Sequence, residues 1–198
     1  MPPSHVAIVS AAKFLRRFRR NRRGSAAVEF ALVAPLFFGL LFAIIETGMV
    51  FFANEVLETI TQDSARIIQT GQAMTSGGVS ATQTGPLTAA QFQQYVCTQI
   101  PALFSCNNIY IDVESYPPSG AWPASFSNQI DSNGNFMTGN LQYNTGGPCD
   151  VVIVRLFYQW PLFVTGLGFN LSNLSGGKRL LWSSAAFRNE PYGTCTSS

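Results

Sequence analysis

Charged side chains are scarce in this sequence, and histidine is nearly absent. Asp, Glu, Lys and Arg make up 11% of the 198 residues, less than half of the roughly 25% that is usual in soluble domains. The one histidine, His5, lies near the N-terminus, so a Ser-His or Cys-His nucleophile pair cannot be built in the remainder of the chain. Gly176-Gly177-Lys178 lacks the rest of a phosphate-binding loop. We therefore expect no enzyme, no cofactor and no small-molecule substrate.

The few charges are also unevenly distributed. Seven of the twelve basic residues lie between Lys13 and Arg23, whereas all ten acids follow Gly24 together with five basic residues, which gives that part a net charge of 5 − 10 = −5. Clustered arginines are able to neutralise nucleic-acid phosphates. A basic head on an acidic body, however, indicates two compartments rather than one binding surface. We therefore expect no nucleic-acid partner.

An apolar run follows the basic cluster directly. Residues 30–45 carry no charge, and the run resumes after Glu46 and ends at Asn54. Residues 30–53 would form about 36 Å of helix, enough to cross a hydrocarbon core of roughly 30 Å with some tilt. We predict a transmembrane helix in the lipid bilayer. Because basic residues favour the cytoplasmic side, residues 1–24 are expected in the cytoplasm, 25–54 in the membrane and 55–198 outside.

Glu46 interrupts this apolar run and has two interpretations. A carboxylate near the outer headgroup region costs little, whereas a carboxylate inside the membrane usually marks a helix contact or a paired charge. We favour the headgroup position.

The remainder of the chain predicts an α+β domain. Apolar spacing favours continuation of the helix over residues 55–70 and a second helix over 88–104, with Thr88 as a possible N-cap. Ile109, Ile111 and Val113 alternate with polar residues and predict a strand. Residues 151–160 predict a central strand, residues 180–187 the last strand, and Asn133-Gly134 a hairpin turn. We expect a small, mostly antiparallel sheet with a helix packed on it, in a pilin-like arrangement.

Two carboxylates fall on one face of the first expected strand. Asp112 and Glu114 have a spacing that a glycosidase pair could use. Such a pair is more often the solvated side of an alternating strand, and we expect that position here.

Four cysteines follow the apolar run, as expected in an oxidising compartment. Four cysteines allow three pairings; we favour Cys97 with Cys106 and Cys149 with Cys195, the second of which would tie down the C-terminus. The rival interpretation is a metal site. Because CxxC spacing is absent and no histidine lies outside the leader, we expect disulfides and no metal.

A cleavable signal would place small residues after the apolar run, but here they precede it, in RRGSAAVEF. This stretch resembles the type III signal of prepilins. The resemblance implies cleavage by a prepilin peptidase between Gly24 and Ser25, with Glu29 and Phe30 as the fifth and sixth residues of the mature chain. It further implies that Glu29 neutralises the new α-amine of a neighbouring subunit. The alternative is that Glu29 complements the helix dipole from the first turn.

The longer segment GSAAVEFALVAPLFFGLLFAIIETG is similar to the start of TadE-like proteins, which are pseudopilins of the Tad (Flp) pilus assembly system. CDVVIVRLFYQWP and AAFRNEPY resemble the strands that end their periplasmic domains. The resemblance implies a minor pilin in the inner membrane that acts in pilus assembly and surface attachment. Its partners would be other Tad pilins or pseudopilins and inner-membrane platform proteins. The alternative is an uncleaved, signal-anchored periplasmic binding or scaffold protein.

Overall fold

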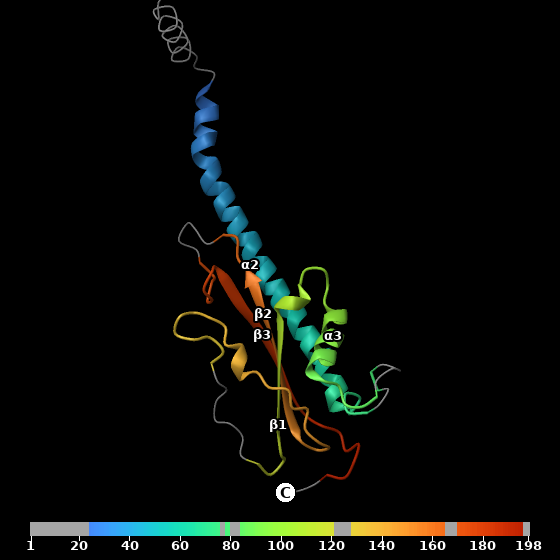
Figure 1. Cartoon of the computed structure of the whole chain (residues 1–198). Coiled ribbons are helices and arrows are strands. Elements are labelled where there is room, and N and C mark those ends of the chain that lie inside the picture. Colours follow the sequence, from blue (N-terminus) through green and yellow to red (C-terminus); the bar gives the residue numbers. More distant parts are fainter. Residues whose placement is uncertain (1–23, 76–77, 80–83, 121–127, 165–169, 196–198) are drawn as a thin grey trace, which may run out of the picture. The chain divides into compact units, whose positions relative to one another are not determined.

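The structure is a computed structural model that describes residues 24–75, 78–79, 84–120, 128–164 and 170–195. The expected basic leader before Gly24 therefore lies outside the described residues. The elements follow the order α2 (Ser25–Gln69), α3 (Ala89–Gln99), η2 (Cys106–Asn108), β1 (Ile109–Tyr116), η3 (Thr138–Asn140), β2 (Val151–Pro161) and β3 (Lys178–Arg188) (Figure 1). The expected α+β class, with a long N-terminal apolar helix before an antiparallel sheet, is confirmed.

The chain divides into two compact units, with the boundary between Ile44 and Ile45. The division falls inside α2 and inside the range that the sequence assigned to the membrane, so the second unit already includes the last part of that range. From Ile45 onward, α2 is an element of the folded domain.

In the second unit, α2 buries one face. Its buried residues recur at spacings of three and four, as expected for an amphipathic helix, and they are Val50, Ala53, Leu57, Ile60, Thr61, Ser64, Ala65, Ile67 and Ile68. The helix ends where Gly71 adopts a left-handed φ of 74°, and the N–H groups of Gly71 and Ala73 donate to the carbonyls of Ile68 and Ile67. Glycine accepts such a conformation without steric cost, which explains why the helix stops near the expected residue.

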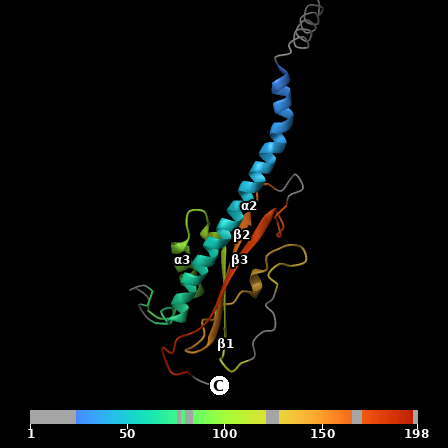
Figure 2. The same ribbon diagram turned by 180° about the vertical axis from the view of Figure 1, so that it is seen from behind.

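The sheet is antiparallel with the order β1-β2-β3, so β2 is central as predicted. Side chains alternate between its two faces. Val152, Val154 and Leu156 pack into a core shared with α2 and α3, whereas Phe157 packs on the other face with Leu174 and Leu180. The segment around η3 lies on the opposite side of the sheet from α3 (Figures 1 and 2).

Helix α3 is shorter than the sequence indicated. It begins after Thr88, whose side chain and N–H form a capping box with Gln91. It ends at Gln99, five residues before the expected end. The prediction to residue 104 was wrong because Pro101 disfavours a helical conformation at the residue before it, and Ile100 is extended with φ −78° and ψ 136°.

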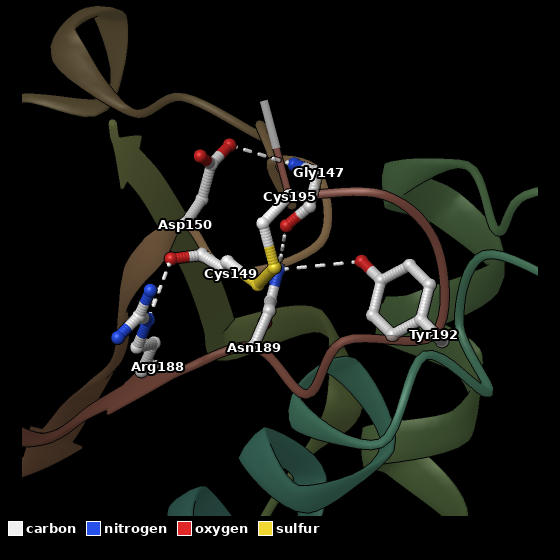
Figure 3. Close-up of a disulfide and its surroundings, with 7 residues drawn as sticks. All are labelled: Gly147, Cys149, Asp150, Arg188, Asn189, Tyr192 and Cys195. Atoms are coloured by element: carbon white, nitrogen blue, oxygen red, sulfur yellow. Dashed lines mark hydrogen bonds between the residues drawn. A yellow bond between two sulfur atoms is a disulfide. The ribbon is translucent and has the colours of Figure 1, made fainter. Parts of the chain in front are cut away.

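Two disulfides fasten this domain, in the pairing that we favoured. Cys97–Cys106 joins the end of α3 to the start of η2, and Cys149–Cys195 joins the residues before β2 to the C-terminal segment. Beside the second disulfide, the Asn189 amide donates to the carbonyl of Gly147 (Figure 3). It also donates to the carbonyl of Thr145. The C-terminal segment is thus held by both covalent and hydrogen bonds.

Removing Cys149–Cys195 should destabilise the domain more than removing Cys97–Cys106. The two bridges close segments with sequence separations of 46 and 9, and the longer loop removes more entropy from the unfolded chain. We expect a loss of about 2–4 kcal/mol for each double Cys→Ser variant, with the larger loss for the Cys149/Cys195 pair. Urea denaturation of the detergent-solubilised chain measures both, and an equal or reversed order would contradict the loop-entropy account.

Candidate functional site

Helix α2 exposes an unusually large apolar surface. Within the described part of the chain, it is the one helix that is long and apolar enough to cross a membrane, with a mean hydropathy of 2.4 over its best window and none of that window buried. The large apolar side chains exposed along it are Val28, Phe30, Leu32, Val33, Leu36, Phe37, Phe38, Leu40, Leu41, Phe42, Ile44, Ile45, Met49, Phe51 and Phe52. Water is a poor solvent for such a surface, so it must be covered by lipid or by apolar protein.

The residues of the expected processing signal lie at the start of this helix. Gly24 is exposed and immediately precedes Ser25, the first residue of α2. Glu29 and Phe30 follow in the helix and are exposed, Phe30 by 66%. The first turn contains no acid, and Glu29 lies directly after it, so both interpretations of Glu29 stay predictions. Cleavage after Gly24 remains a prediction.

Glu46 is covered by the protein itself and is not a solvated acid, while its expected level near the outer headgroups stays a prediction. Its side chain is buried, with 6% exposure. Its carboxylate accepts hydrogen bonds from the backbone N–H groups of Phe163 and Val164, which follow β2; the bond from Val164 is 3.1 Å long. The sequence could not show this contact, because it joins residues 117 and 118 positions apart. Glu46 thus attaches α2 to the β2–β3 connection within the second unit.

Glu46→Ala should loosen this attachment. The substitution leaves two backbone donors without their acceptor, which costs about 1–3 kcal/mol for each group that stays buried. We expect a lower free energy of unfolding and faster amide exchange at Phe163 and Val164. Glu55→Ala, at an exposed position of the same helix, serves as the matched control. Equal exchange rates in the two variants would show that Glu46 does not hold the connection.

A buried ionic cluster lies on the sheet face that carries η3. Arg155 of β2 stands opposite Asp112 of β1 in the register, and its Nε donates to the Asp112 carboxylate at 2.7 Å. The Arg155 guanidinium also pairs with Glu114, to which the Tyr116 hydroxyl donates. The expectation that Asp112 and Glu114 form a solvated face was wrong, since Asp112 is fully buried. Their engagement with Arg155 also removes the basis for a glycosidase pair.

The pKa values in this cluster follow from its burial. Desolvation raises the pKa of Asp112, even though the Gln142 N–H and Arg155 stabilise its charged form. Desolvation and the hydrogen bond to Glu114 raise the pKa of Tyr116 to about 12. A buried carboxylate is tolerated when a cation and hydrogen-bond donors surround it. The cluster therefore has a structural role that depends on Arg155.

Arg155→Met should destabilise the domain strongly, by about 3–5 kcal/mol, because it leaves the Asp112 carboxylate buried without its cation. The pKa of Asp112 is already raised and should rise further. Protonation then relieves the unpaired charge, so the loss should be larger at neutral pH than near pH 4. Denaturation at both pH values measures it, with Lys178→Met as an exposed control of the same charge change. A loss independent of pH would contradict the unpaired-carboxylate explanation.

A pocket of about 360 Å³ lies beside this cluster, over the same face of β2 and β3. Apolar side chains provide much of its wall, and Trp182 at its edge is 58% exposed. Its lining includes no His, Cys, Asp or Glu. Elsewhere among the described residues, no group of three such side chains is close enough to hold a metal ion.

The fold and these sites define an α+β protein whose long N-terminal helix exposes a membrane-compatible surface and then enters the domain core. The TadE-like protein family model matches residues 24–66, which confirms the family resemblance inferred from the start of the chain. The match ends within α2, so the resemblance proposed for the C-terminal strands stays a prediction. Comparisons with curated proteins and with solved structures gave no match.

Proposed function

We propose that this chain is a pseudopilin or minor pilin that takes part in assembly of the Tad (Flp) pilus and so in surface attachment. The family match over α2 supports a role in Tad pilus assembly. The observation that carries the finer proposal is the exposed apolar surface of this helix immediately after Gly24. A helix with such a surface acts by packing in lipid and against other apolar helices.

Processing would create the assembly-competent N-terminus. A prepilin peptidase would cut between Gly24 and Ser25, leaving α2 at the very start of the mature chain. Glu29, exposed one turn into the helix, would then neutralise the α-amine of a neighbouring subunit. A carboxylate among apolar helices is costly unless it is paired, so this pairing would set the register between subunits.

The proposed location is the inner membrane, with the N-terminus in the cytoplasm and the disulfide-bonded domain in the periplasm. Two disulfides agree with an oxidising compartment. The domain would act without catalysis, by docking on other Tad pilins or pseudopilins and on inner-membrane platform proteins. The alternative function, an uncleaved periplasmic binding or scaffold protein, would use the same anchor; the pocket beside Trp182 is the feature that favours it.

Leader removal separates these functions. Co-expression with the matching prepilin peptidase should yield a membrane-extracted chain whose intact mass begins at Ser25. Gly24→Ala should retain the full leader, because the prepilin signal that this stretch resembles has a glycine directly before the cut. Ala26→Gly, two positions beyond the cut, serves as a control that should still be processed.

A full-length mass for the unaltered chain in the presence of active peptidase would contradict the pseudopilin proposal and favour the uncleaved anchor. Cleavage that is unaffected by Gly24→Ala would place the processing site elsewhere.

A further inference from the structure

The connection that follows β2 contains an exposed aromatic side chain. Phe163 follows β2 closely and is 84% exposed, the highest value among the large apolar side chains of the described residues. It belongs to an uncharged stretch that reaches from Leu156 to Gly177. An isolated exposed Phe is unremarkable in a soluble protein, so its meaning depends on what lies next to it.

The neighbouring part of α2, within the same compact unit, is apolar on its outward face. Ile45, Met49, Phe51 and Phe52 are exposed by 49%, 40%, 68% and 60%. Glu46, Val50 and Ala53 are buried on the inward face. Over residues 45–53, one side of the helix therefore packs on the domain, while the other side is apolar and exposed, as in a lipid-facing helix.

Glu46 fixes the level at which the connection meets this helix. Its carboxylate accepts the N–H groups of Phe163 and Val164. Phe52 lies six positions further along α2, which corresponds to about 9 Å of helix rise. If lipid covers the outward face as far as Phe52, the connection at Glu46 lies below the outer surface of the bilayer. Amphipathic segments bind at a comparable depth of about 5–10 Å.

We propose that residues 162–164, which follow β2 and include the exposed Phe163, insert into the outer interfacial layer of the bilayer that α2 would span. This proposal rests on the membrane anchor of the proposed function. The domain would then hold the membrane at two places, the helix and the Phe163 segment, and its tilt relative to the membrane would be restricted.

Continuity with the helix surface favours lipid as the partner. Glu46 holds Phe163 beside the part of α2 whose outward side chains are apolar and exposed. Leu162, Phe163 and Val164 carry no charged side chain that would oppose insertion. Lys178, exposed and opposite Pro161 in the register, follows the uncharged stretch. Its flexible side chain is able to extend an ammonium group to lipid phosphates while its stem stays apolar.

Quenching by brominated lipid tests the proposal. The full-length chain would be reconstituted into phosphatidylcholine vesicles with bromines at shallow acyl positions, and Phe163→Trp compared with the parent protein to isolate the added emission. We expect a loss on the order of half of that emission, because the ring would lie near the headgroup boundary. Glu190→Trp is the matched control: Glu190 is exposed and its N–H donates to the Gln69 carbonyl at the other end of α2, roughly 35 Å from Glu46 along the helix. Its added emission should not be quenched.

Flotation of the vesicles in alkaline carbonate distinguishes a failure of the proposed membrane anchor from a failure of the proposed insertion at Phe163. A chain that does not float with the vesicles overturns the membrane anchor and the proposed function with it. A chain that floats while Phe163→Trp stays unquenched overturns only the insertion of the segment. Blue-shifted but unquenched emission would also overturn it, since a protein partner and not lipid would then cover residue 163.

Discussion

The burial of one face of α2 against the apolar face of β2 is the packing on which the domain depends. From Val50 to Ile68, the helix places its apolar side chains against Val152, Val154, Leu156 and Tyr158, and α3 packs into the same core through Phe92 and Val96. The side chains on this face of β2 are apolar, and leaving them in water would be unfavourable. The helix that carries the candidate membrane span therefore also provides a large part of the domain core, so anchor and domain cannot be separated at residue 54 without removing part of that core.

The other face of the sheet is covered by the largely irregular segment around η3. Aromatic contacts and an ionic cluster stabilise this side of the domain. Phe136 packs on Tyr110 and Phe157, and the Arg155 cluster holds β1 and β2 together. The Gln142 N–H donates to Asp112, which links the covering segment to the same cluster. A buried charge pair contributes little net stability compared with an apolar replacement. Arg155 and Asp112 stand directly opposite each other in the register of the two strands.

The ends of the domain are secured by contacts that are distant in sequence. The Glu190 N–H donates to the last residue of α2, Gln69, and Cys149–Cys195 closes the segment that contains β2 and β3. At the opposite end of β2, Glu46 holds the connection that carries Phe163. Helix α2 is thus attached to the sheet region at both ends of its buried stretch.

Local sequence alone determined the features that depend on near neighbours. The uncharged run after the basic cluster specified the long apolar helix, Gly71 its end, Thr88 and Gln91 the start of α3, and the ten-residue apolar segment before Pro161 the central strand. Pro101 also contained the information that α3 stops at Gln99, which the apolar spacing beyond it obscured. These features follow from helix and strand periodicity and from backbone conformational limits, which act over a few residues.

The tertiary structure alone decided the partners of the charged groups. Asp112 and Glu114 alternate with apolar residues as solvated side chains do, and only the cover of that sheet face together with Arg155 in the adjacent strand makes them a buried cluster. The single charge in the otherwise apolar β2 was the signal for it. Glu46 likewise looks like a solvated acid until the β2–β3 connection is placed beside it. Burial and pairing depend on chain segments far apart in sequence, and no local pattern encodes which of them will meet.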